Sequence, residues 1–164
     1  MSSPFVAILM GSANDIDTMQ TCADTLTAMN IPHEINVLSA HRTPDLTQQY
    51  VHKATERGAA VFIAAAGLAA HLAGAVAAHT IRPVIGVPLD AGTLGGLDSL
   101  LSTVQMPGGM PVATTTIGKP GAKNAAILAA QIMAIQNPAI ANTITSMREQ
   151  KRQSIIASNN KLKD

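Results

Sequence analysis

Aromatic residues are nearly absent from this chain. Its 164 residues include no tryptophan, one tyrosine and two phenylalanines, whereas alanine is frequent. Small side chains let helices and strands approach closely, but each of them buries little apolar area. A core of this kind gains stability from contacts between subunits, so the composition predicts an oligomer.

Cysteine and charge are also scarce. Cys22 is the only cysteine, which excludes an internal disulfide, and its place in an amphipathic stretch predicts that it packs in the core. Charged residues make up 13% of the chain, the formal net charge is +1, and no basic run exceeds two residues. Because a nucleic-acid partner requires a basic face, we expect none. The hydrophobic share of 47% predicts an ordered chain with a substantial core.

The segment 58–81 contains no Asp, Glu, Lys or Arg and is about as long as a membrane span. Gly67, His71 and Gly74 interrupt it, and much of it is weakly hydrophobic alanine. A buried parallel strand followed by a buried helix explains it better. The first apolar run follows no basic region and ends early at Gly11, which is untypical of a signal peptide. We therefore expect no membrane partner and a cytoplasmic protein.

Apolar strands alternate with amphipathic helices along most of the chain. The patterns predict strands at 5–10, 34–38, 60–65, 84–87 and 112–116. They predict helices at 16–29, 44–58, 70–79, 97–104 and 122–135. This alternation indicates an α/β fold, with a parallel sheet, right-handed crossovers and helices on both faces, in a flavodoxin-like or related order.

The segment after Pro138 is more polar and has one narrow apolar face. We expect one domain over residues 1–164, with a core at about 5–136 and a C-terminal helical tail at 138–164. Because the tail offers so little apolar surface to its own subunit, we expect it to lie across a neighbouring subunit.

A polar loop follows the first strand. Gly11 permits a tight turn, Ser12 and Asn14 offer hydrogen bonds, and the helix behind them offers free N–H groups that suit a phosphate. Asp15 would repel a phosphate, but its carboxylate suits ribose hydroxyl groups. The alternative is that Ser12, Asn14 and Asp15 only cap the helix.

The second loop is the hexapeptide Ser39-Ala40-His41-Arg42-Thr43-Pro44. The forked cation of Arg42 matches a phosphate or a carboxylate, and the imidazole of His41 can move a proton at neutral pH. Ser39 adds a hydroxyl group. The alternative is structural, with His41 hydrogen-bonded in place and Arg42 paired with Asp45.

The third loop spans residues 67–72 and combines small residues and backbone donors with His71 at a helix start. It can admit a planar ring or a carboxylate; the alternative is close helix–sheet packing around a hydrogen-bonded histidine. Because parallel strands end at the same edge of a sheet, the three loops predict one site.

Several common sites are missing from the sequence. No two histidines have a metal-ligand spacing supported by a nearby Cys or Glu, so we expect no metal. The motifs G-x-x-x-x-G-K-[ST], G-x-G-x-x-G and G-x-S-x-G do not occur. ATP hydrolysis, dinucleotide redox chemistry and esterase chemistry therefore have no support, and we expect no cofactor.

The three loops and the segments that follow them resemble the class I 5-(carboxyamino)imidazole ribonucleotide mutase family of purine biosynthesis. The resemblance extends over residues 5–135 and rests on long motifs in a fixed order. They are 10–12 with Asp15 and Met19, 39–45, 69–72 with Gly74, 83–88, 97–102, 104–107, 111–114 and 124–126.

This resemblance implies a flavodoxin-like three-layer sandwich that assembles as a homo-octamer. It also implies an isomerase that converts an N-carboxylated aminoimidazole ribonucleotide into its C-carboxylated isomer without ATP, metal or cofactor. In that family His41 corresponds to the general acid/base, Arg42 and the serines serve the phosphate, and Asp15 serves the ribose. The substrate-binding residues carried over in this way are Ser12, Asp15, Ser39, Arg42, Ala70, His71 and Leu72.

Three positions depart from the family pattern, in which serine, glycine and proline are usual at the places of Asn14, Leu68 and Ala73. Asn14 can still donate a hydrogen bond to a phosphate. Leu68 belongs to the third loop, so it alters the shape of the pocket for carbon dioxide.

Three other functions stay open. A related class carboxylates the unmodified aminoimidazole ribonucleotide directly with carbon dioxide, but its histidine is usually followed by lysine, so Arg42-Thr43 favours the mutase. A nicotinate-type mononucleotide carboxylase shares this domain but carries an extra N-terminal region. A flavodoxin-like binding or signalling module would have no need of His41 beside Arg42.

Overall fold

A five-stranded parallel sheet forms the centre of the molecule, in the strand order β2-β1-β3-β4-β5. The computed structural model describes residues 3–162. The strands are β1 (Phe5–Met10), β2 (His33–Val37), β3 (Ala59–Ala66), β4 (Val84–Pro88) and β5 (Ala113–Thr114). The chain runs outward from β1 to β2 and then returns to β3, so the order reverses between β1 and β3. In sheets of this kind the reversal point is where ligands bind.

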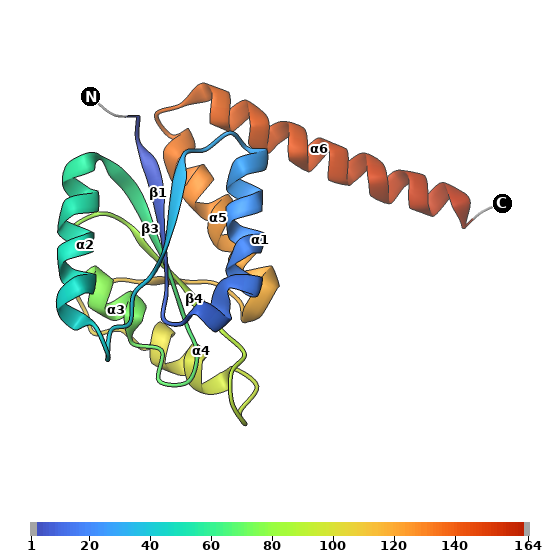
Figure 1. Cartoon of the computed structure of the whole chain (residues 1–164). Helices are drawn as coiled ribbons and strands as arrows, with labels where there is room; N and C mark the ends of the chain where they lie inside the picture. The colour runs from blue at the N-terminus through green and yellow to red at the C-terminus, as the bar shows by residue number, and fades with distance from the viewer. Residues whose placement is uncertain (1–2, 163–164) are drawn as a thin grey trace.

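Helices cover both faces of the sheet (Figure 1), which confirms the predicted flavodoxin-like three-layer architecture. Helices α1 and α5 lie on one face, and α2 and α3 lie on the other. The helical elements are the 3₁₀ turn η1 (Ala13–Asp15), α1 (Ile16–Ala28), α2 (Pro44–Arg57), α3 (Leu72–Ala77), α4 (Leu97–Val104), α5 (Gly118–Ala134) and α6 (Pro138–Lys161).

The central strand β1 is buried along its whole length because both of its faces are covered. Its side chains alternate: Val6, Ile8 and Met10 enter the core beneath α1 and α5, whereas Ala7 and Leu9 enter the core beneath α2 and α3. Cys22 of α1 lies in the first of these cores, as the sequence predicts, and burial raises the pKa of its thiol to about 12.

Helix α4 packs against β4 and β5 at the carboxyl end of the sheet. Its close approach depends on Gly86 of β4. A Cβ atom at this position would lie 2.4 Å from Cγ2 of Thr103 and 3.0 Å from Cγ1 of Val112. The absence of a side chain at Gly86 therefore sets the depth at which α4 sits on the sheet.

Three element boundaries differ from the predicted ones. Helix α3 is shorter than the predicted 70–79, because a tight turn precedes it, in which the His71 N–H donates to the Ala69 carbonyl at 2.9 Å, and the His79 N–H bonds three residues back to Val76 at its other end. Helix α5 begins at Gly118 rather than at 122, since Gly118 turns the chain with a φ of 73° and Pro120 is tolerated in a first helical turn. Strand β5 pairs over two residues only, where 112–116 was expected.

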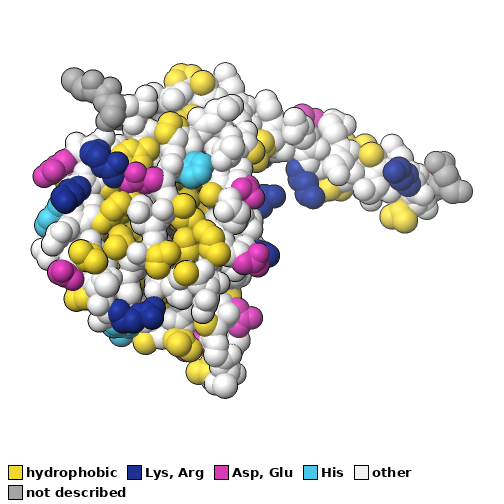
Figure 2. All heavy atoms as spheres, in the orientation of Figure 1, with side chains coloured by type: hydrophobic (Ala, Val, Ile, Leu, Met, Phe, Trp, Pro, Cys, Tyr) yellow, Lys and Arg dark blue, Asp and Glu magenta, His cyan; other side chains and the backbone are white. Residues whose placement is uncertain are grey.

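Helix α6 is the predicted C-terminal tail. Asn137 caps its first turn by accepting from the N–H of Ala139 at 3.1 Å, and Ile140 and Ile144 are buried against the core. From residue 148 to 162 every residue is exposed. Figures 1 and 2 show this half of the helix extending away from the body of the molecule, with charged and apolar side chains along it.

None of the helices in residues 3–162 is long and apolar enough to cross a bilayer. The uncharged segment 58–81 instead forms β3 and α3, the buried strand and helix that its composition predicts.

Candidate active site

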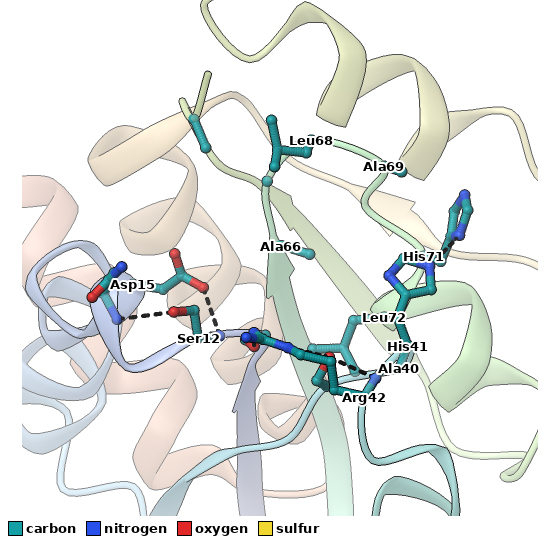
Figure 3. Close-up of a pocket in the computed structure, with 15 residues that line it drawn as sticks. Ser12, Asp15, Ala40, His41, Arg42, Ala66, Leu68, Ala69, His71 and Leu72 are labelled. Carbon is teal, nitrogen blue, oxygen red and sulfur yellow. Dashed lines mark hydrogen bonds between the residues drawn. The ribbon is translucent and has the colours of Figure 1, made fainter.

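A cavity of about 550 Å³ opens at the carboxyl ends of β1 and β3, where the strand order reverses. Figure 3 shows its walls, which come from all three loops that the sequence singles out. The lining residues are Gly11, Ser12, Asn14, Asp15, Ser39, Ala40, His41, Arg42, Ala66, Gly67, Leu68, Ala69, His71, Leu72 and Ala91.

The first loop is held by a reciprocal cap. The Ser12 N–H donates to Oδ2 of Asp15 at 3.0 Å, and the Asn14 N–H donates to Oγ of Ser12 at 3.2 Å. The side chains of Ser12 and Asp15 therefore cap the 3₁₀ turn η1, whereas Asn14 contributes only its backbone N–H. Capping is not their whole placement, because Ser12, Asn14 and Asp15 also line the cavity. The Ser12 hydroxyl keeps its own hydrogen for a ligand.

Asp15 is a half-buried carboxyl group, and burial raises its pKa above the ordinary value. The Ser12 N–H and the charge of Arg42 act in the opposite direction but more weakly. A carboxylate that has already lost part of its hydration gains more from a new hydrogen bond than an exposed one does. Asp15 is therefore suited to accept from hydroxyl groups of a ligand.

The second loop fixes the Arg42 guanidinium at the cavity wall. The N–H of Arg42 donates to Oγ of Ser39 at 3.1 Å, Nε lies 3.4 Å from the same oxygen, and Nη2 donates to the carbonyl of Gly11 at 2.9 Å. The alternative in which Arg42 pairs with Asp45 is wrong: among residues 3–162, no ion pair joins them. The guanidinium instead spans the first and second loops, with its other N–H groups available to an anion.

His41 and His71 join the second and third loops. Nε2 of His41 lies 2.7 Å from Nδ1 of His71, and the two rings meet edge to face with centroids 4.8 Å apart. Both side chains are exposed toward the cavity. Two imidazoles in direct contact can hold and pass a proton at one end of a site that carries a cation at the other.

One predicted site residue does not reach the cavity. Ala70 is buried, and its N–H donates to Oγ of Ser102 in α4 at 3.0 Å, so it shapes the third loop from behind. The other predicted residues, Ser12, Asp15, Ser39, His41, Arg42, His71 and Leu72, all line the cavity.

The residue-by-residue reading of the loops missed Ala66, Ala91 and Ser102. Ala66 ends β3 and Ala91 follows β4, so the position of each beyond a strand end was the available signal. Nothing in the local sequence around Ser102 indicates that it bonds a loop 32 residues away.

Within residues 3–162, no group of three or more His, Cys, Asp or Glu side chains is arranged to hold a metal ion. The polar groups of the cavity are those that recognise phosphate, hydroxyl and carboxylate groups of an organic ligand.

The family model described as AIR carboxylase matches residues 5–154, which is most of the chain. This chain belongs to the AIR carboxylase family. The N5-carboxyaminoimidazole ribonucleotide mutase of Bacillus subtilis is 52% identical to it over 159 residues, which cover 97% of this chain and 98% of that protein. The protein of the same name from Escherichia coli K12 is 48% identical over 151 residues, covering 92% and 89%.

Solved structures agree with this membership of the AIR carboxylase family. The crystal structure of Treponema denticola PurE superposes with a TM-score of 0.89 and 30% identity, covering 99% of this chain and 100% of that one. A single-residue variant of PurE2 from the same organism gives a TM-score of 0.91 at 29% identity, with the same coverage of both chains.

Leu68 stands where the resemblance leads us to expect glycine, and its φ of 55° lies in the left-handed region that glycine adopts freely and leucine does not. Its large side chain lines the cavity.

Proposed function

We propose that this protein is an N5-carboxyaminoimidazole ribonucleotide mutase of purine biosynthesis. It converts N5-carboxyaminoimidazole ribonucleotide into 4-carboxy-5-aminoimidazole ribonucleotide, which makes it an isomerase. The observation that carries the proposal is the 2.7 Å contact between His41 and His71 in a cavity that also holds Arg42, in a chain about half identical to mutases over nearly its whole length.

The polar end of the cavity suits the ribose phosphate. Arg42 offers charged N–H groups in a fork, and the hydroxyls of Ser12 and Ser39 lie on the same wall, so together they bind a phosphate. Asp15 accepts from the ribose hydroxyls. The imidazole ring and its carboxyl group then lie toward the third loop, against His71 and Leu72, with Ala70 supporting the loop from beneath.

The reaction breaks one bond and makes another. The carbamate C–N bond of the substrate breaks, carbon dioxide leaves, and N5 receives a proton from His41. The electron-rich ring carbon C4 of the resulting aminoimidazole ribonucleotide then attacks the same carbon dioxide. His41 removes the proton from C4, so substrate and product differ only in the position of the carboxyl group. Confinement keeps the two fragments together, and general acid–base catalysis by a histidine contributes about 10²–10⁴-fold.

The proposal extends to the whole chain and its assembly. We propose that residues 1–164 form one domain that acts as a homo-octamer in the cytoplasm, with residues 5–136 as the catalytic unit. Support for assembly comes from the distal half of α6, where Ile155 and Ile156 are 54% and 38% exposed on a helix with no cover from its own chain. Exposed apolar side chains on a projecting helix are typical of subunit contacts.

The deciding experiment is the ultraviolet assay of N5-carboxyaminoimidazole ribonucleotide with purified protein, without ATP or added bicarbonate. Conversion at enzymatic rates supports the mutase. Carboxylation of aminoimidazole ribonucleotide only at high bicarbonate would replace it with the direct carboxylase. Inactivity in both assays, with binding of the nucleotide retained, would favour a flavodoxin-like binding module.

A further inference from the structure

Two features of Leu68 each reduce the stability of the folded protein. Its φ of 55° is costly for a residue with a large side chain, and that side chain is 56% exposed although it is apolar. It lies on the wall of the cavity. Strained backbone is kept where the surrounding structure enforces it, and such strain is concentrated at functional sites.

The structure around Leu68 enforces this conformation from two sides. Ser102 of α4 accepts from the Ala70 N–H at 3.0 Å, and its Oγ lies 3.4 Å from the carbonyl oxygen of Leu68. On the other side Gly67 packs closely against the segment after β4, because a Cβ at Gly67 would lie 2.6 Å from Cβ of Ala91. The loop therefore presents Leu68 in one fixed orientation.

That orientation brings the leucine side chain over to the glycine-rich segment 90–96. Cδ2 of Leu68 would lie only 2.7 Å from a Cβ placed on Gly92. In Figure 3 Leu68 stands above Ala66, on the far side of the cavity from Arg42. The leucine thus bridges the third loop and the segment after β4, and covers the cavity at that end.

The side chains at this end of the cavity are apolar. Ala66 and Ala69 lie near Leu68 in Figure 3, and Ala91 of the cavity wall lies against Gly67. None of these side chains can donate or accept a hydrogen bond, so the polar groups at this end are those of the main chain. The cation and the hydroxyl groups belong to the other end. An uncharged molecule without hydrogen-bond donors fits the apolar end better than the phosphate or the ribose does.

We infer that Leu68 retains carbon dioxide during the reaction. Its side chain covers the apolar end of the cavity while carbon dioxide is detached, so that C4 recaptures the same molecule before it escapes. This inference rests on the proposed mutase function. Leu68 moves no proton and touches no reacting bond; it sets how often the intermediate completes the cycle rather than leaving as aminoimidazole ribonucleotide plus carbon dioxide.

The test measures what fraction of the intermediate goes on to the carboxylated product and what fraction is released as aminoimidazole ribonucleotide and carbon dioxide. The parent protein, Leu68→Gly, Leu68→Ala and Leu68→Met are each given N5-carboxyaminoimidazole ribonucleotide in ¹³C-bicarbonate buffer. Released aminoimidazole ribonucleotide and ¹³C in the carboxylated product are then quantified. We expect both quantities to rise about tenfold in the glycine and alanine variants, the size that loss of an apolar group from a pocket produces. The methionine variant, which restores bulk, returns them toward the parent values.

The variants also distinguish the effect of the Leu68 side chain over the cavity from the effect of its strained backbone. Leu68→Gly removes both the side chain and the backbone strain, whereas Leu68→Ala keeps the strain and removes only the cover. Equal leakage in the two variants supports the inference. Leu94→Ala is the matched control, because Leu94 is 61% exposed in the neighbouring segment but does not line the cavity.

Two results would overturn the inference, and they are distinguishable. If the parent converts the substrate and Leu68→Gly leaks no more than the parent, Leu68 has no part in retention and the mutase function stands. If the parent protein itself does not convert the substrate, the proposed function fails, and the inference fails with it.

Discussion

Nε2 of His41 faces Nδ1 of His71 at 2.7 Å, so one of these nitrogens donates a hydrogen and the other accepts it. The contact fixes the ring orientation of both residues and joins loops that are 30 residues apart in the chain. A substrate that binds beside His41 therefore meets an imidazole with one ring nitrogen already hydrogen-bonded to His71. Such a bond holds an acid–base group in position.

Replacing His41 by asparagine is expected to lower kcat by about 10²–10⁴-fold, because the proton acceptor for C4 is lost. Replacing His71 by phenylalanine keeps a ring in place but removes the hydrogen bond, and a smaller loss of kcat is expected. Both side chains are exposed, so the thermal midpoints of the variants should match that of the parent. Normal turnover by His41→Asn would exclude its proposed role.

Arg42→Ala is expected to weaken substrate binding by roughly ten- to a hundredfold, the usual effect of losing a charge-assisted hydrogen bond. Arg42→Lys should recover only part of this loss, since lysine keeps the charge but not the fork. Arg82→Ala is the control, because Arg82 is exposed and lies before β4, at the opposite end of that strand from the site. Calorimetric titration measures the affinities, and an unchanged affinity in Arg42→Ala would refute the phosphate assignment.

Asp15→Asn is expected to change the stability of the fold and the affinity for substrate in opposite directions. Burial raises the pKa of Asp15 in the folded protein above its ordinary value of 3.8, so the folded state holds this proton more tightly than the unfolded chain does. The resulting stability is present at low pH and is lost as the pH rises through the folded pKa. Asparagine removes that loss and can still accept from the Ser12 N–H.

The variant should therefore gain stability relative to the parent between about pH 4 and pH 7, while its affinity for substrate falls by about tenfold. Urea unfolding at the two pH values and calorimetric titration measure the two effects. A variant that is less stable than the parent at neutral pH would show that capping outweighs burial at this position.

Glu34→Gln tests the ion pair between Glu34 and Arg57. The pH dependence of its contribution to stability has the opposite sign to that of Asp15. Its hydrogen bond with Arg57 holds the pKa of Glu34 below the ordinary value of 4.5. The pair therefore stabilises the fold above pH 4.5, and this contribution is lost as the pH falls through the folded pKa. Because Arg57 is half exposed, we expect a loss of no more than about 1 kcal/mol at neutral pH that disappears in acid. A pH-independent difference in urea unfolding would contradict this origin.

Removing the exposed half of α6 tests the proposed assembly. A chain ending at Met147 keeps the buried Ile140 and Ile144, so its fold should be intact by circular dichroism. Without residues 148–164 the oligomer should become smaller in sedimentation velocity. An unchanged size would show that the tail helix does not lie across a neighbouring subunit.

Much of the fold follows from local patterns. Short uninterrupted apolar runs that end at a glycine, such as 5–10, are typical of strands covered on both faces, and Pro44 and Gly58 mark the limits of α2 to within a residue. Boundaries fail where a tight turn replaces the first turn expected of a helix. Ala70 lies in such a turn, because the next N–H, that of His71, donates to the carbonyl of Ala69 at 2.9 Å.

The sequence predicts that the three loops meet in one site, because parallel strands end at the same edge of a sheet, and all three loops do line one cavity. Which side chains touch each other there was not predictable, because it depends on the strand order, and strand order depends on pairings between distant residues that no local pattern encodes. The contact between His41 and His71 is a product of that order. The role of Ala70 as a buried support, and not as part of the cavity wall, likewise depends on where α4 lies.

The missing side chain at Gly86 extends the set of mutations that can inactivate the enzyme well beyond the cavity. Alanine at this position would push α4 away from the sheet through Thr103, and Ser102, the preceding residue, would be drawn off the Ala70 N–H. The third loop would then lose its anchor. In a survey of inactivating substitutions, a glycine in the middle of a strand would be grouped with the active-site residues, although no substrate atom comes near it.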